Sequence, residues 1–102
     1  MVKAIKNWNA DIVCSRDLNG TITNVPRRII VHSPTGFSWG YGGSGPADLA
    51  WNILSIFIGQ EEAEKYYQMF KWQFIATMPI KGGVIKREVI LKWIEEQRKR
   101  NQ

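Results

Sequence analysis

Cysteine and histidine are scarce in this chain of 102 residues, which holds one of each, Cys14 and His32. A single cysteine excludes an intrachain disulfide and fits a reducing compartment. One cysteine and one histidine are also too few to complete a zinc cluster. We therefore expect neither a disulfide scaffold nor a metal centre. Cys14 lies in a short β-branched run, where we expect it to be a buried structural thiol.

Long apolar runs and catalytic motifs are missing too. No apolar stretch approaches the roughly 20 residues that a membrane-spanning helix needs, and the N-terminal residues lack a signal-peptide core. His32 and Ser33 are neighbours on an expected strand, so their side chains point apart. The carboxylates of residues 61–64 are typical of an acidic first helical turn. We expect a cytoplasmic protein that is not an enzyme, has no cofactor and does not bind a membrane.

The composition is that of one small globular domain covering residues 1–102, with 44% apolar and 23% charged residues. Such a small domain buries a modest share of its surface, so a homo-oligomer is expected. Five tryptophans are more than its core should absorb, so some should line a pocket or an interface. The net charge of +5 suits a nucleotide or a nucleic acid. Part of this charge belongs to Arg98–Arg100, which we interpret as a solvated helix end.

Strand signals dominate the first third of the chain. Asp11–Arg16 and Thr21–Thr23 flank the turn Asp17–Gly20, whose Asn-Gly pair is typical of a tight hairpin. Arg27–His32 has the strongest strand pattern. A turn at Ser33–Gly36 follows.

Helical spacing dominates the remainder. A first helix is predicted from Pro46 to Gly59, with Gly45 or Ser44 as its cap and Asp48 in its first turn. Two later helices are predicted from Gln60 to about Thr77 and over Arg87–Arg98, with a loop at Lys81–Gly83 between them. This order favours an α+β fold, a small antiparallel sheet covered by two or three helices. The expected core positions are Leu49, Ala50, Ile53, Leu54 and Phe57, then Ala63, Tyr67, Phe70 and Phe74, then Val89, Ile90, Trp93 and Ile94.

The run Phe37–Ala50 combines aromatic residues with glycines at 40, 42, 43 and 45, directly before a helix. It is not a P-loop, because Pro and Ala follow Gly45. It matches G-x-G-x-x-G formally, but no βαβ unit surrounds it. Backbone N–H groups of Gly42–Gly45 and the Ser44 hydroxyl can still approach an anion at a helix N-terminus. The alternative is a structural loop whose glycines supply positive φ angles.

The neighbours of this loop suggest a nucleotide site. Asp48 and Asn52 are one helical turn apart and can read sugar hydroxyls. Alternatively, Asp48 caps its own helix and Asn52 bonds the loop backbone. Aromatic rings of the loop can stack a base, and nearby cations can neutralise phosphate. The full set of expected ligand-binding residues is Arg28, Phe37, Trp39, Tyr41, Gly42, Gly43, Ser44, Gly45, Asp48, Asn52 and Lys71.

The motif from His32 to Ala50, with Asn52–Leu54 and Tyr67 to Phe74, resembles a small domain family of phages, prophages and bacteria whose function is unknown. The resemblance covers roughly residues 27–95 and ends in a helix around Trp93. In size, charge and site chemistry the chain is also similar to phage counter-defence sponges. That similarity implies a protein that sequesters a nucleotide immune signal, such as a cyclic ADP-ribose isomer, in the host cytoplasm to inhibit antiphage defence. The alternatives are a small basic nucleic-acid-binding domain and an inhibitor of a host protein.

Overall fold

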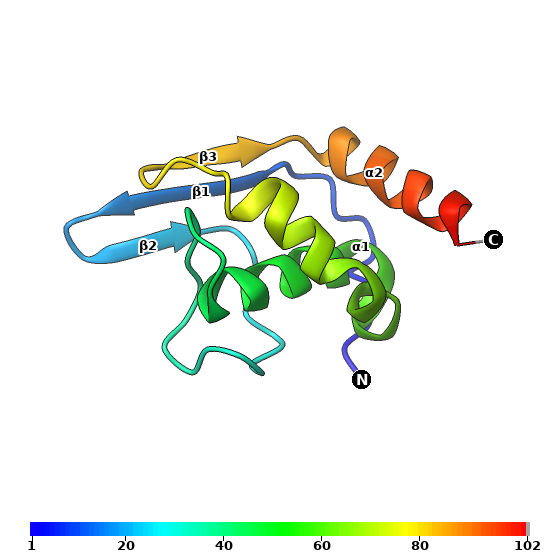
Figure 1. Cartoon of the computed structure of the whole chain (residues 1–102), viewed down its shortest axis with the longest axis horizontal. Coiled ribbons are helices and arrows are strands. Elements are labelled where there is room, and N and C mark those ends of the chain that lie inside the picture. Colours follow the sequence, from blue (N-terminus) through cyan, green and yellow to red (C-terminus); the bar gives the residue numbers. More distant parts are fainter. Residues whose placement is uncertain (102) are drawn as a thin grey trace.

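The computed structural model describes residues 1–101, which form one three-stranded antiparallel sheet and two long helical stretches (Figure 1). The predicted α+β fold with a small antiparallel sheet is confirmed. The strand order is β2-β1-β3. The elements are β1 (Ile12–Asp17), β2 (Gly20–Thr23), α1 (Ser44–Phe70), the π-helical turn η1 (Lys71–Ile75), β3 (Gly82–Ile85) and α2 (Arg87–Arg100).

The first two strands form the hairpin that the sequence predicted. Asp17 is opposite Gly20, so the connection has two residues, and the Asn19 N–H donates to the Asp17 carboxylate (2.7 Å). Gly20 has φ 121°, a value that glycine adopts without strain. The Asn-Gly pair is therefore a correct hairpin signal.

The third strand is not the predicted one. Arg27–His32 forms no strand; it runs along α1, and side chains of that helix bond its backbone. The strand that completes the sheet is Gly82–Ile85, which overlaps the predicted loop at Lys81–Gly83. Glycine is required there, because a Cβ on Gly82 would lie 2.0 Å from the Cys14 carbonyl oxygen and the backbone has φ +119°.

Helix α1 begins two residues before the predicted start, at Ser44, with Gly43 as its N-cap. Asp48 therefore lies beyond the first turn, which contains no acidic residue. The predicted break at Gly59 is confirmed, since this residue has φ 78° and ψ 167° within the otherwise helical segment. Beyond the break, the helix continues to Phe70 and passes into η1.

The N-terminal half of α1 is the centre of the core, and residues 45–56 are buried on every side. Most of the tryptophans are also buried, with Trp39, Trp51 and Trp93 at most 7% exposed, so the core absorbs more of them than expected. Trp72, at 59% exposure, is the one that is open to solvent. Helix α2 packs through Ile90, Trp93 and Ile94 as predicted, whereas Val89 is exposed.

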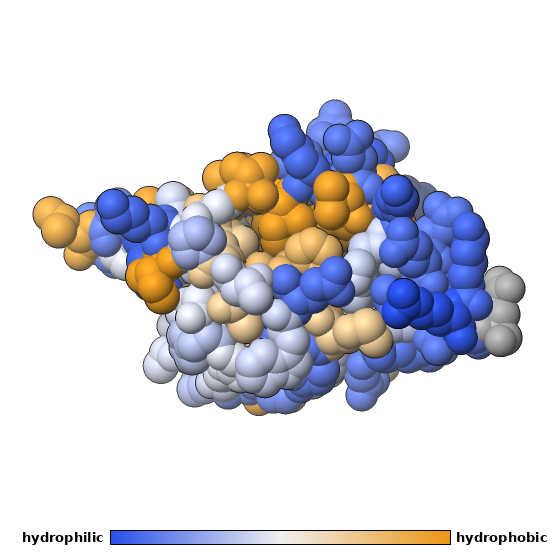
Figure 2. Space-filling view, turned by 45° about the horizontal axis from the view of Figure 1, so that its top comes forward, coloured by the Kyte–Doolittle hydropathy of each residue, from blue (hydrophilic) through white to orange (hydrophobic). Residues whose placement is uncertain are grey.

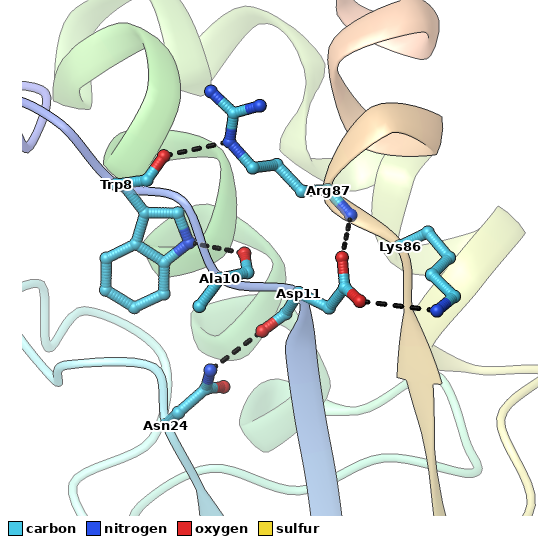
Figure 3. A network of polar contacts seen from close by, with 6 residues as sticks. All are labelled: Trp8, Ala10, Asp11, Asn24, Lys86 and Arg87. Atoms are coloured by element: carbon cyan, nitrogen blue, oxygen red, sulfur yellow. Dashed lines mark hydrogen bonds and ion pairs between the residues drawn. The ribbon is translucent and has the colours of Figure 1, made fainter.

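Asp11 fixes the junction between β3 and α2 (Figure 3). Its carboxylate accepts the Arg87 backbone N–H (2.8 Å) at the start of α2 and lies 3.4 Å from the Lys86 ammonium. The Arg87 hydrogen bond lowers the pKa of the Asp11 carboxyl, and the charge of Lys86 adds to this effect. Asn24 donates to the Asp11 carbonyl (2.8 Å). Asp11 thus contacts the start of α2 through its side chain and the residue after β2 through its backbone carbonyl.

Candidate functional site

The polar stripe of α1 holds a neighbouring segment of the chain. The Asn52 side-chain oxygen accepts the N–H groups of Arg28 (2.8 Å) and Ile29 (2.9 Å), and its amide donates back to the Ile29 carbonyl (2.9 Å). The Asn52 side chain therefore makes the hydrogen bonds to Arg28 and Ile29 that a neighbouring strand would otherwise make. This contact explains why a segment with strong strand propensity stays outside the sheet.

Asp48 does the same one turn earlier. Its carboxylate accepts the backbone N–H groups of Val31 (3.3 Å), His32 (3.0 Å) and Ser33 (2.9 Å). Asp48 and Asn52 are both 0% exposed. Their oxygens are occupied by backbone donors inside the protein, so they present no acceptor to a sugar at the surface. Neither alternative is met as predicted: Asn52 and Asp48 bond the backbone of residues 28–33 and not that of the glycine loop, and Asp48 does not cap its own helix.

The expected stacking residue Trp39 is enclosed as well. Its ring is 0% exposed, its indole N–H donates to the Ile80 carbonyl (2.9 Å), and the Arg16 guanidinium lies 4.7 Å from the ring centre. Phe37 is half-buried against the core. The rings of Trp39 and Phe37 are therefore less accessible for stacking than the ring of Tyr41, which is 51% exposed.

Arg28 lies away from the glycine loop. Its guanidinium donates to the Lys3 carbonyl (2.7 Å) and to the Ser55 hydroxyl (2.9 Å). Ser55 is eleven residues after Ser44, or about 16 Å along a helix of 1.5 Å rise per residue. Burial lowers the pKa of Arg28, and its buried Nε has no hydrogen-bond partner within residues 1–101. The structure does not bring Arg28 to the loop.

The glycine loop does present backbone N–H groups. Ala47 is the first residue of this region whose N–H is bonded to the loop, through the Gly43 carbonyl (3.1 Å). Within residues 1–101, no acceptor receives the N–H groups of Gly43, Ser44 or Gly45, and Ser44 is exposed. The N–H groups of Gly43 and Ser44 lie at the positive dipole end of the helical segment that runs from Ser44 to the break at Gly59, whereas Gly45 is buried.

Lys71 lies beside these groups and is the expected cation that the structure brings to the loop. Its ammonium donates to the Gly42 carbonyl (3.2 Å) and lies 4.4 Å from the Trp72 ring centre. The residue is only 6% exposed, yet within residues 1–101 no carboxylate is within 4 Å of it. A buried ammonium without a carboxylate partner is electrostatically unfavourable, and the adjacent positive helix end adds to this.

Trp72 is the residue that sequence reasoning missed. A Cβ on Gly42 would lie 2.1 Å from its ring, so glycine lets the loop lie flat against the indole. A Cβ on Gly43 would likewise lie 2.4 Å from the Tyr41 ring. Two exposed rings, Tyr41 and Trp72, therefore flank the middle of the loop. The signal in the sequence was the pair Lys71-Trp72, a cation beside an aromatic ring.

The single histidine is half-buried and bonded to a side chain, and the single cysteine is buried. The His32 ring is within 2.8 Å of the Tyr67 hydroxyl, and Tyr67 stacks on Trp51 with ring centres 4.6 Å apart. The hydrogen-bond partner of the His32 ring is therefore a side chain. Cys14 is 3% exposed, and this burial raises the pKa of its thiol. A raised pKa disfavours the reactive thiolate, in agreement with a structural role.

The described residues hold no group of three or more histidine, cysteine, aspartate or glutamate side chains that could bind a metal ion. Over residues 1–101, no helix has the length and apolar character to cross a membrane. The main hollows of the surface lie away from the glycine loop, beside the Gly59 break and between η1, β3 and α2.

Fold and site together define a small α+β domain with a glycine-rich loop and a buried lysine at a helix N-terminus. The chain belongs to the DUF6166 family, a family of unknown function, whose sequence profile matches residues 3–96. The match includes both the loop and α2, so the resemblance to a small domain family extends beyond residues 27–95 to the first two strands. No curated protein and no solved structure matches the chain.

Proposed function

We propose that this protein binds a phosphate-bearing nucleotide at the N-terminus of α1 and retains it without chemical change. The observation that carries the proposal is Lys71, a buried ammonium with no carboxylate partner within residues 1–101 beside open backbone N–H groups. A phosphate would pair with the ammonium and accept from the N–H groups of Gly43–Gly45.

The base would lie against the exposed rings. Tyr41 and Trp72 flank the loop, and both have an open aromatic surface. Stacking on such rings accepts any purine or pyrimidine and supplies roughly 1–3 kcal/mol per base. Trp72 takes the stacking role that the sequence suggested for Trp39. Asp48 and Asn52 support the site from within by holding residues 28–33 in place.

The resemblance to phage counter-defence sponges suggests which nucleotide would bind. The ligand would be a nucleotide immune signal, such as a cyclic ADP-ribose isomer, held so that antiphage defence is not triggered. Sequestration needs enclosure, and the loop lies on an open part of the monomer surface. A homo-oligomer that covers the loop with a second copy would supply that enclosure. The proposal involves no catalysis, because the Cys14 thiol is buried and the half-buried His32 ring is bonded to Tyr67.

Thermal-shift assays and calorimetry test the site, first with inorganic phosphate and then with nucleoside monophosphates, cyclic dinucleotides and cyclic ADP-ribose isomers. We expect ligand-free Lys71→Met to be more stable than the wild type by about 1 kcal/mol, because the substitution removes a buried positive charge from beside the positive end of a helix. We also expect the ligand-induced shift to vanish. Lys65→Met, an equal charge change at an exposed helical position, should alter neither property. A panel without any thermal shift, or a shift that persists in Lys71→Met, would refute the proposal.

Nucleic-acid binding is the second candidate, favoured by the net charge of +5 and by the exposed rings of Tyr41 and Trp72. It predicts an affinity that falls steeply with added salt and varies little with nucleotide identity. Nucleotide binding at Lys71 predicts the opposite pattern, with sharp discrimination among ligands of equal charge. Titrations of a single-stranded oligonucleotide and of the mononucleotides at two salt concentrations separate the two functions.

A further inference from the structure

Strand β3 has a free edge. It pairs with β1 on one side only, since the sheet order is β2-β1-β3. On β1, the Val13 N–H points toward β2, where it donates to the Asn24 side chain (3.0 Å). Val84 is directly opposite Val13. In an antiparallel pair, opposite residues turn their backbone groups either toward each other or both away. The N–H and C=O of Val84 therefore point out of the sheet.

An apolar groove runs beside this edge. One hollow of about 310 Å³ lies between the end of η1 and residues 83–86, and Phe74, Met78 and Val89 contribute to its walls. A second hollow of about 400 Å³ shares Phe74 and Val89 with the first and continues along α2. Figure 2, which brings the upper side of Figure 1 forward, shows apolar surface gathered in the middle of this face with hydrophilic surface around it.

The groove lies on the face of the sheet that the helices cover. A Cβ on Gly83 would lie 3.4 Å from the Met78 side chain, and Ile85 is only 7% exposed. A strand added beside Val84 would point every second side chain toward this face. Those side chains would enter the groove, while the backbone of the added strand would bond to Val84. Edge and groove therefore suit one kind of ligand, an extended peptide.

The charges at the edge decide between a second copy and a different partner. Lys81 and Lys86 stand at the two ends of β3, and both are exposed. If two copies paired through β3, outward-facing residues would be opposite each other, with Val84 opposite Val84. The Lys81 end of each β3 would then lie against the Lys86–Arg87 end of the other copy, and like charges opposite each other are destabilising. Lys86 has Asp11 as a partner at 3.4 Å, whereas within residues 1–101 Lys81 has no carboxylate within 4 Å. An acidic residue on the added strand would complement Lys81.

We propose that the β3 edge and the adjoining groove bind an extended segment of another protein, with alternating apolar residues and an acidic residue that faces Lys81. The segment adds a fourth strand to the sheet beside Val84. This surface is separate from the glycine loop, so the proposal does not depend on nucleotide binding.

A displayed library of random ten-residue peptides, selected against the immobilised full chain, tests the proposal. We expect enriched sequences with alternating apolar residues and an acidic residue at one end. Bound peptide should slow hydrogen exchange of the Val84 N–H. Val84→Pro removes that N–H at an edge position where proline is tolerated, and it should weaken binding about tenfold. Val84→Thr keeps the N–H and is the matched control.

A second variant keeps the test decisive if Val84→Pro fails to fold. Val89→Asp places a charge on the exposed wall of the groove and should also abolish peptide binding. The proposal is overturned if no peptide is enriched, or if enriched peptides bind Val89→Asp as well as the wild type. It is also overturned if sedimentation shows a wild-type dimer that Val84→Pro dissociates, because the occupant would then be a second copy.

Discussion

Replacing Asp48 with asparagine tests whether the polar stripe of α1 is structural. The carboxylate accepts the N–H groups of His32 and Ser33 through different oxygens, at 3.0 and 2.9 Å, in a site that is 0% exposed. Asparagine has one acceptor oxygen, and its amide would place a donor against the second N–H. One buried backbone donor then stays unpaired, and a charge-assisted hydrogen bond is lost.

The expected cost is large for so small a domain. A hydrogen bond to a charged group contributes roughly 1.5–3 kcal/mol, and an unpaired buried donor costs about 1–3 kcal/mol, so Asp48→Asn should lose about 3 kcal/mol of unfolding free energy. For a chain of about 100 residues this corresponds to a drop in Tm of roughly 15 °C. Urea unfolding followed by tryptophan fluorescence measures the change, because Trp51 packs near His32.

The result also separates the two interpretations of Asp48. If the residue read a ligand, the variant would keep its stability and lose ligand binding. A loss of less than about 1 kcal/mol would refute the structural reasoning, since even one unpaired buried donor costs that much. Ser44→Ala is a useful comparison, because Ser44 is exposed and its side chain caps nothing. That variant should leave stability nearly unchanged.

Two further predictions concern the sheet and the helix pair. Gly82→Ala should destabilise the protein by more than about 2 kcal/mol, because its Cβ would meet the Cys14 carbonyl and φ is +119°; a variant with wild-type Tm in thermal unfolding would contradict this. The Arg98 hydrogen bond lowers the pKa of Glu62 below its ordinary value of 4.5. The stability from this pair is therefore complete above about pH 4.5 and is lost as the pH falls through the folded-state pKa. Glu62→Gln should remove that part of the acid dependence, about 1 kcal/mol or less for so accessible a pair, and an unchanged acid limb in urea titrations would argue against it.

The sequence predicts the local elements well, because their signals are local. The Asn-Gly turn, the break at Gly59 and the apolar face of α2 each depend on residues within a few positions. The third strand is different. Gly82 and Gly83 have poor strand propensity, and at Gly82 the close approach of the Cys14 backbone leaves no room for a Cβ. Such a contact joins residues far apart in the chain, so no local pattern reveals it.

The error at Arg27–His32 has the same origin. This segment has the composition of a strand, but the acceptors for its N–H groups are the side chains of Asn52 and Asp48. A sequence pattern cannot tell which partner a strand-like backbone will find. The polar stripe on α1 can be seen in the sequence, but the burial of this helix cannot. Helix α1 is buried on all sides at residues 45–56, so polar residues on it must find partners inside the protein.

That requirement changes how polar residues near a glycine loop are interpreted. On a surface helix, Asp48 and Asn52 would be open to a ligand; on a fully buried helix, their hydrogen bonds are needed for folding. Lys71 is the informative exception, because it is also buried and, within residues 1–101, its ammonium has only the Gly42 carbonyl and an aromatic ring as partners. A carbonyl and a ring do not neutralise an ammonium. The unbalanced charge lies beside the loop that precedes the helix N-terminus, and this is why we propose the ligand site at Lys71 and Trp72 and not at Asp48 and Asn52.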